Sequence, residues 1–448
     1  MKSSAQNLTS GSLWRQILVF SIPLMLSNLL QVLFNMSDIA VVGHFAGSMA
    51  LGSVGSTTTL VTMFTGFLIG LSGGINVLTA LYLGARNKKS TSDIVHSAAV
   101  ISLTAGLLLF LAGFTFSRQI LLLLNTKEEL IEGAVLYIRI YFLGMPALAM
   151  YNFGNAVFSA AGDTRRPLLY LSIAGVLNVF LNLFFVIVWN MGAAGVGAAS
   201  AISQYVSAFL IIRDLLASKD IFQLRLSSLR LHPSSARDIL RIGIPCGLQN
   251  SIFAIANLFI QLGVNSFSAI MVAGNSAAAN SDALIYDVMA AFYTACASFM
   301  SQNYGAKKPE RVMKSYVVSL TYSFGAGILL GGLLILFGEP FLSLFTSDPE
   351  VIAAGMKRLT IMGFSYGVSA FMDCTIAASR ALGKSVVPTI IVILGSCVFR
   401  VAWVYTIFAW YKTIPSLYLL YIFSWTITAA AEIIYFRRVY RKTVSQMA

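Results

Sequence analysis

One carboxylate lies among amides in the first long apolar segment of the chain. The polar side chains there, at spacings of three, four and three residues, are Asn28, Gln31, Asn35 and Asp38. A helix of about 3.6 residues per turn puts all four on one face. Lipid cannot satisfy such a face, which must therefore contact protein or a wet cavity. A carboxylate flanked by amides can bind a desolvated cation or carry a proton.

A second pair of amides supports a cation site. Asn178 and Asn182 lie four residues apart and so share a helix face in a later apolar segment. Ser200 or Ser203 in the following segment can add a hydroxyl. We predict a coupling-ion or proton site that consists of Asp38, Asn178, Asn182, Asn35 and Ser203. Two alternatives remain: the amides hold membrane helices together, or Asp38 lies at the outer membrane interface.

The second half of the chain has acids of its own within apolar segments. Asp282 and Asp287 lie in one segment and Asp373 in another. These acids can attract a cationic substrate into a wet cleft, or Asp282 and Asp287 can simply line the mouth of their helix. The predicted substrate cleft comprises Asp282, Asp287, Asp373, Gln31 and Asn257.

Two further charges need partners inside the bilayer. Arg400 lies deep in an apolar segment, and Asp373 is a candidate partner, which would make both residues structural. Glu432 lies five residues before Arg437, and we expect it to pair with Arg437 or its neighbours. The four cysteines lie in apolar stretches without a CxxC pair or a nearby histidine. We expect them to be small buried hydrophobes, and we expect no metal cluster.

These groups are embedded in a chain that is too apolar for water. Of its 448 residues, 57% are hydrophobic and 10% are charged, whereas soluble domains carry about a quarter charged residues. The mean hydropathy is +0.80. A bilayer-spanning helix needs about 20 apolar residues. The apolar runs predict twelve such helices, at 14–42, 54–82, 94–116, 133–160, 168–189, 195–217, 239–264, 276–301, 314–337, 355–380, 386–409 and 415–436.

The basic residues predict one orientation in the membrane. With both termini on one side, 23 of the 30 basic residues lie on that side. The five on the other side are Arg118, Lys127, Lys357, Arg358 and Lys412. The positive-inside rule makes the richer side cytoplasmic. The net charge of +13 is therefore a topology signal and does not indicate nucleic-acid binding. We expect the first apolar run to be a retained helix, since it lacks a small-residue cleavage site.

The two halves of the sequence repeat each other. Matched pairs, at an offset of 222 and then 221, are Pro23 and Pro245, Asn28 and Asn250, Asn35 and Asn257, and Gly162 and Gly383. A register held across six segments indicates duplication. Six helices per half, an even number, make the repeat parallel, and such repeats are typical of secondary transporters. Asp38 matches Ile260, so this charge exists in one half only.

Five motifs follow one another in an order found in one transporter family. They are Pro23 and Asp38 with Val42-Gly43, the turns Gly84-Ala85-Arg86 and Gly305-Ala306-Lys307, the segment 162–167 (GDTRRP) with its echo at 383–388, and Asn178 with Asn182. Together they resemble the multidrug and toxic compound extrusion (MATE) family over essentially the whole chain. The first-helix aspartate, without a seventh-helix glutamate where Phe253 stands, is most similar to the DinF-like branch.

The resemblance implies an all-α integral membrane fold of twelve transmembrane helices, in two six-helix lobes related by a parallel internal repeat. We expect an N-terminal lobe at 1–217, a cytoplasmic linker at 218–238 and a C-terminal lobe at 239–448. In the family the polar cluster of the N-terminal lobe takes up the coupling ion. Some relatives have a second aspartate where this chain has Asn182, so a single proton or a single Na⁺ at Asp38 both remain open.

The predicted function is efflux of amphipathic organic cations by proton- or sodium-coupled antiport, with alternating access between the lobes. A flippase or exporter of a lipid-linked precursor or endogenous metabolite is the alternative on the same fold. A channel or receptor is disfavoured by the repeat and the lone carboxylate, and an enzyme by the lack of paired catalytic groups. We expect no cofactor besides the coupling ion, membrane lipids but no nucleic acid as partners, and a monomer in a bacterial-type plasma membrane.

The orientation can be tested in the loop after the second helix. Replacing Arg86, Lys88 and Lys89 together with neutral residues removes the charges that retain this loop in the cytoplasm. We expect altered accessibility of cysteines introduced on either side of the loop to a membrane-impermeant thiol reagent. Unchanged labelling would contradict the inside and outside assignment.

Overall fold

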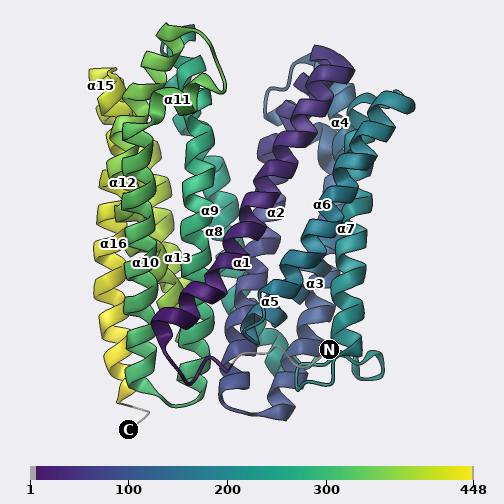
Figure 1. The fold of residues 1–448 in the computed structure, drawn as a ribbon, viewed down its shortest axis with the longest axis vertical. Coiled ribbons are helices and arrows are strands. Elements are labelled where there is room, and N and C mark those ends of the chain that lie inside the picture. Colours follow the sequence, from purple (N-terminus) through teal and green to yellow (C-terminus); the bar gives the residue numbers. More distant parts are fainter. Residues whose placement is uncertain (1–6, 446–448) are drawn as a thin grey trace. The chain divides into compact units, whose positions relative to one another are not determined.

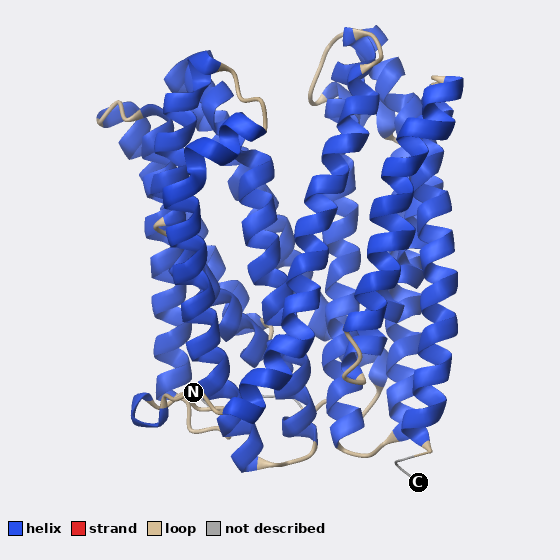
Figure 2. Ribbon diagram, turned by 180° about the vertical axis from the view of Figure 1, so that it is seen from behind, coloured by secondary structure: helices blue, strands red, loops and turns tan. Residues whose placement is uncertain are grey.

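The computed structural model describes residues 7–445, and every regular element in this range is a helix (Figure 2). The helices of the first half are α1 (Leu13–Val41), η1 (Val42–Ala46), α2 (Gly47–Gly84), α3 (Lys88–Leu123), α4 (Glu128–Phe142), α5 (Met145–Ala160), α6 (Arg165–Leu183), η2 (Phe184–Val188) and α7 (Gly192–Ala217) (Figure 1). The helices of the second half are η3 (Leu226–Ser228), α8 (Pro233–Asn265), α9 (Ala269–Gly305), α10 (Pro309–Leu336), α11 (Gly338–Ser343), α12 (Pro349–Ala381), α13 (Val386–Val392), η4 (Ile393–Val398), α14 (Phe399–Trp403), η5 (Val404–Phe408), α15 (Ala409–Tyr411) and α16 (Ile414–Val444).

Ten helical stretches within 7–445 are long and apolar enough to cross a membrane. One of them, Leu13–Gly84, has 72 residues. At about 1.5 Å per residue it would be about 108 Å long, against a hydrocarbon core of about 30 Å. It therefore crosses twice, as α1 and α2 on either side of η1. The helices α4 and α5, which meet at a 45° bend, form one more span. The twelve predicted spans are thus present in the described chain.

The internal repeat is visible in the helix boundaries. α4 and α5 together run from Glu128 to Ala160, and α12 runs from Pro349 to Ala381, displaced by 221 residues at both ends. The first copy is broken where the second is continuous. Pro146 has no amide hydrogen to donate to the carbonyl of Phe142, the last residue of α4. The matching residue in α12 is Gly367, which retains its amide.

The chain forms two compact units whose boundaries fall within helices. The first unit contains Leu26–Ser251, and the second joins Leu8–Met25 to the chain from Ile252 onward. The start of α1 therefore belongs to the second unit: Leu13, Ile17 and Phe20 pack in one cluster with residues of α9. Likewise the start of α8 belongs to the first unit. The predicted lobes at 1–217 and 239–448 follow the repeat, and they remain our proposal for the sequence units.

Small residues bring α2 and the start of α8 into backbone contact within the first unit. Gly70 and Gly74 on α2 face Gly243 and Gly247 on α8. A Cβ at Gly70 would lie 2.5 Å from the backbone of Cys246 and Gly247, and one at Gly74 would lie 2.7 Å from the amide of Gly243. Membrane helices approach this closely where small residues recur every fourth position.

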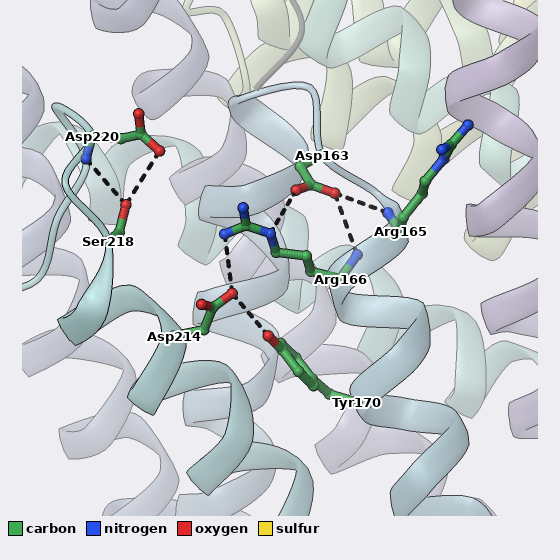
Figure 3. Close-up of polar contacts among 7 residues, drawn as sticks. All are labelled: Asp163, Arg165, Arg166, Tyr170, Asp214, Ser218 and Asp220. Carbon is green, nitrogen blue, oxygen red and sulfur yellow. Dashed lines mark hydrogen bonds and ion pairs between the residues drawn. The ribbon is translucent and has the colours of Figure 1, made fainter. Parts of the chain in front are cut away.

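A polar corner fixes α6 against α7 at the end of the first unit that we predict to be cytoplasmic (Figure 3). Asp163 accepts hydrogen bonds from the amides of Arg165 and Arg166 at 3.2 and 3.3 Å. The Arg166 side chain pairs with Asp163 at 3.0 Å and with Asp214 on α7 at 3.1 Å. Tyr170 donates to the same Asp214 oxygen at 2.8 Å. The GDTRRP segment thus fixes the start of α6 against the end of α7.

The stretch 218–232 connects α7 to α8 and docks on the first unit. Phe222 and Leu224 are only 4% and 3% exposed. His96 Nε2 accepts a hydrogen bond from the amide of Arg225 at 3.0 Å, while its Nδ1 contacts the carbonyl of Ser92 at 2.7 Å. The predicted linker, 218–238, overlaps this stretch, and α8 begins within it.

The glycine crossing predicts a sharp difference between two alanine substitutions on α2. Gly70→Ala places a methyl against backbone, which cannot move away, and we expect it to lower the free energy of unfolding by about 1–3 kcal/mol. Gly73→Ala is the control, because no atom lies within 4 Å of its Cβ position. The measurement is thermal unfolding of both variants in the same detergent. Equal midpoints would show that the two helices are not in close contact.

Candidate functional site

A cavity of about 230 Å³ with both polar and apolar walls lies within the first unit. Its walls come from α1, α2 and α4–α7. The lining residues include Gln31, Phe34, Asn35, Asp38, Thr62, Thr65, Tyr141, Tyr151, Asn152, Asn178, Ser200, Ser203, Gln204 and Ser207. Apart from Asp38 none of these side chains is ordinarily charged. The cavity therefore presents one carboxylate to its contents, surrounded by neutral polar groups and aromatic rings.

Asp38 is held by two neighbouring helices. The Asn182 amide nitrogen, on α6, donates a short hydrogen bond to one carboxylate oxygen. The Ser200 hydroxyl, on α7, donates to the other oxygen at 3.1 Å. Asn182 also donates to the side-chain oxygen of Asn178 at 3.2 Å, and Asn178 donates to Ser200 Oγ at 3.4 Å. The four side chains form a closed ring of hydrogen bonds that joins α1, α6 and α7.

Some oxygens in this region lack a donor. Asn182 Oδ1 and Ser203 Oγ are buried, with no hydrogen-bond partner among the described residues, and so is Gln204 Oε1. Buried polar atoms in proteins normally have partners, and exceptions indicate an ion or water that the atoms are placed to bind. Carboxylate, amide and hydroxyl oxygens are the ligands that hard cations prefer. The arrangement can therefore hold a small cation, or a proton on Asp38.

The structure brings together the residues predicted for the coupling site. Asp38, Asn178 and Asn182 form the hydrogen-bonded ring, while Asn35 and Ser203 line the same cavity. The hydroxyl that contacts Asp38 is that of Ser200 rather than Ser203. Gln31, which we predicted to lie in the substrate cleft, also lines this cavity. The role of these residues in ion coupling remains a prediction.

Several lining residues were not predicted. Tyr141, Tyr151 and Asn152 come from α4 and α5, and their types alone gave no signal. Gln204 and Ser207 of α7 were also missed, although the sequence carried a signal for them. With Ser200 and Ser203, which were named as candidates, they are spaced at i, i+3, i+4 and i+7, which defines one polar face on an otherwise apolar helix.

The acids of the second unit have different surroundings. Asp282 on α9 forms an ion pair with Arg358 of α12 and accepts a hydrogen bond from Tyr366. Arg358 is only 4% exposed and its guanidinium stacks over Tyr418. Arg358, counted above among the basic residues of the outer side, lies inside α12 and is paired there. Whether Asp282, Asp287 or Asn257 contacts substrate remains a prediction.

Arg400 is surrounded mainly by aromatic rings. Its guanidinium lies 4.7 Å from the ring centre of Tyr421, and 5.6 Å from those of Trp425 and Phe253. Nε donates to Ser424 at 3.0 Å. Asp373 acts on it only at longer range, so the predicted direct pair is absent from the described contacts. Stacking on several rings stabilises a buried guanidinium without a facing carboxylate.

The predicted partner of Glu432 is also wrong. Glu432 is fully buried, and neither carboxylate oxygen has a hydrogen-bond partner in the described chain. All four cysteines are buried and free, as expected for small hydrophobes. Within the described residues, no group of three or more His, Cys, Asp or Glu side chains could hold a metal ion.

The family follows from a comparison with known sequences. The sequence profile of the MatE family matches residues 23–184 and 245–406, two ranges displaced by 222 residues at both ends. The chain belongs to the MatE family. It is therefore a membrane transporter and not an enzyme, and the duplicated match agrees with the repeat read from the sequence. The narrower similarity to the DinF-like branch remains a prediction.

Relatives at low identity span most of the chain. The probable multidrug resistance protein YpnP of Bacillus subtilis is 29% identical over 381 residues, which cover 84% of this chain and 85% of the relative. The probable multidrug resistance protein NorM of Thermotoga maritima is 25% identical over 394 residues, covering 85% and 82%. A solved structure described as the outward-facing conformation of a multidrug resistance MATE family transporter aligns with a TM-score of 0.91 at 21% identity, covering 99% of both chains. That likeness establishes the fold of twelve helices in two lobes.

The hydrogen-bonded ring predicts graded effects of removing its amides. Asn182→Ala removes Oδ1, a buried oxygen that can bind a metal cation directly, and a lost contact to a charged group is worth about 1.5–3 kcal/mol, or about 10- to 100-fold in Na⁺ affinity. Asn178→Ala removes neutral bonds, and we expect a loss of about tenfold or less. The measurement is the cation concentration that gives half-maximal dye efflux in liposomes.

The control for both amide variants is Asn265→Ala, at the exposed end of α8. It changes an amide of the same type outside the ring and should leave the half-maximal concentration unchanged. Equal effects of Asn182→Ala and Asn178→Ala would contradict direct contact of Asn182 with the bound cation.

Proposed function

We propose that this chain exports amphipathic organic cations by cation-coupled antiport. The observation that carries the proposal is Asp38, the one acidic residue that lines the cavity of the first unit, beside buried oxygens without donors. An ionised carboxylate in such a place attracts a cation, and a neutral one has taken up a proton. Either form responds to an ion gradient, which a purely structural carboxylate would not.

The substrate class is inferred from relatives and from the cavity. Two relatives named above are called probable multidrug resistance proteins, and a Staphylococcus saprophyticus relative, 22% identical over 265 residues, is called multidrug export protein MepA. A cavity with one carboxylate and the rings of Phe34, Tyr141 and Tyr151 suits a cation with an apolar body. Aromatic faces and a carboxylate attract the same positive charge from different sides.

Coupling follows if the ion and the substrate differ in their affinity for the two conformations. A ligand shifts an equilibrium between two states only through such a difference. In this proposal the ion binds at Asp38 and favours one conformation of α1, α6 and α7, whereas the organic cation binds against aromatic rings of the cavity, outside the hydrogen-bonded ring, and favours the other conformation. Binding of one ligand therefore promotes release of the other, which gives exchange rather than co-transport.

The coupling ion can be a proton or Na⁺. A proton needs only the carboxylate, whereas Na⁺ also needs neutral oxygens, which Asn182 and Ser203 can provide. Asp287, Asp373 and Asn257 of the second unit would attract substrate in the same cycle. We place the protein in a bacterial-type plasma membrane as a monomer, with both termini in the cytoplasm.

A second substrate class has specific support. A relative from Shewanella oneidensis, 23% identical over 371 residues, is called a FAD transporter. If this chain exports an endogenous metabolite of this kind, the transported molecule has an anionic group. Recognition of such a substrate would depend on a cationic group rather than on Asp38. Competition of anionic nucleotides against a cationic dye separates the two classes.

The decisive substitution is Asp38→Asn. Asparagine has the size and hydrogen-bonding shape of aspartate but neither takes up a proton nor neutralises a bound cation. We expect gradient-driven efflux of a cationic dye to fall to the level of empty liposomes, while dye binding in detergent persists. Proton and Na⁺ gradients are imposed separately, so that the same experiment identifies the ion.

Glu129→Gln, an exposed acid at the start of α4, is the matched control and should transport normally. Near-normal efflux by the Asp38→Asn protein would contradict coupling at Asp38. If dye binding and efflux are lost together, Asp38 belongs to the substrate site instead.

A further inference from the structure

A second buried acid lies at the end of a polar face on α16. Ser424, Thr428 and Glu432 are spaced four residues apart, and each is fully buried. The spacing places the three side chains in a row along one side of the helix. The second-unit segments that pack on α16 are α12, α13, η4, α14 and η5.

The first two members of this row are hydrogen-bonded. Ser424 Oγ accepts a hydrogen bond from Arg400 at 3.0 Å and donates to the carbonyl of Tyr421 at 2.9 Å. The hydroxyls of Thr428 and Ser396 lie 3.0 Å apart. These contacts pair groups on α16 with groups on η4 and α14, so the polar face is built into the helix interface.

Glu432 differs from its two neighbours, because neither oxygen has a partner. The charged group that acts on it from α12 is Arg380, which contacts Thr389 at 3.4 Å in this structure. Asp373 on α12 interacts with both Arg380 and Arg400, Arg400 contacts Ser424, and α13, η4 and η5 carry no charged residue. Tyr435 is the remaining titratable neighbour, on α16 itself. An ionised carboxylate that is buried without a hydrogen bond is strongly disfavoured, whereas a neutral carboxyl is tolerated.

The fold does not require an acid at this place. The repeat matches Glu432 to Ile211 of α7, which is also fully buried. A hydrocarbon side chain therefore fills the equivalent position in the first unit. The rest of the polar face is shared, since Ser424 and Thr428 match Ser203 and Ser207, which line the cavity around Asp38.

We propose that Glu432 is a second proton-binding site of the transport cycle, located in the second unit. This second site rests on the proposed function, since it assumes ion-coupled antiport. The ligand is a proton rather than a metal ion, because a metal ion needs several oxygens. Phe436, one turn beyond Glu432 on α16, belongs to a buried hydrophobic cluster with Cys374, Ala377 and Ala378 of α12, and the cation Arg380 acts on Glu432.

The proton on Glu432 is close to the end of the helix from which it would be released. Glu432 lies five residues before Arg437, about 7.5 Å along the helix from the basic end that we predict to be cytoplasmic. When water reaches Glu432, the O–H bond of the carboxyl group breaks and the proton passes to a water molecule. The carboxylate that remains pairs with Arg380, which stabilises the released state until a proton returns.

The test begins with infrared spectra of the full-length protein in lipid. The probe is the proton itself, through the carbonyl stretch of a protonated carboxyl, which shifts in D₂O. We expect the spectrum of the wild type minus that of Glu432→Gln to contain this band. The control is Glu310→Gln, which changes an exposed carboxyl at the start of α10 and should lack it. Loss of an ionised-carboxylate band in the Glu432→Gln protein would overturn the proposal.

The second measurement is the number of protons exchanged per dye molecule in liposomes. We expect Glu432→Gln and Glu432→Leu to exchange one proton fewer than the wild type while dye binding is retained. An unchanged ratio overturns the proposal. Failure of both variants to fold also overturns it, because the acid would then hold the structure together.

The same experiment separates this inference from the proposed function. The Asp38→Asn protein is measured alongside. If Asp38→Asn abolishes coupling and Glu432→Gln keeps the wild-type ratio, the second site is wrong and the coupling role of Asp38 stands. If Asp38→Asn transports normally and Glu432→Gln loses one proton, coupling depends on the second unit and the role of Asp38 is wrong.

Discussion

The hydrogen bond between Asp38 and Asn182 joins α1 to α6 inside a bilayer, where lipid offers no hydrogen-bond partner to either side chain. In a bilayer a carboxylate keeps its place only if protein or trapped water satisfies it. Asn182 and Ser200 do so from α6 and α7. The positions of those helices depend in turn on the Asp163, Arg166 and Asp214 contacts at their other end. The two ends of α6 and α7 are thus held by polar contacts, one set of which includes the charge of Asp38.

Duplication has produced two units that treat the same positions differently. Asp38, Asn178, Asn182 and Ser200 match Ile260, Phe399, Trp403 and Tyr421. Ile260 and Trp403 pack in one hydrophobic cluster of the second unit. Small polar groups line a cavity in the first copy, whereas large apolar or aromatic side chains occupy the matching positions in the second. Because interiors are close-packed, volume not filled by side chains remains available to water or ligand.

Much of the fold could be predicted from the sequence because lipid imposes simple rules. Segment length, loop charge and the offset of 222 residues were sufficient for twelve helices in two halves. The ring around Asp38 was accessible for the same reason, since the spacing of Asn178 and Asn182 defines a face without knowledge of the tertiary structure. Charge pairing was less predictable. The partner of Arg358, for example, is Asp282, which lies 76 residues away in the sequence.

The predictions for Arg400 and Glu432 failed because they assumed that a buried charge needs an opposite charge. Arg400 lies among Phe253, Tyr421 and Trp425. Such rings attract a guanidinium by their electron-rich faces, and sequence distance does not reveal which rings will meet it. A carboxyl has another way to lose its charge, since it can bind a proton. A buried guanidinium cannot lose its charge in the corresponding way, because arginine remains protonated at any accessible pH. Unpartnered buried acids, rather than unpartnered buried arginines, are therefore the groups whose charge can change during a transport cycle.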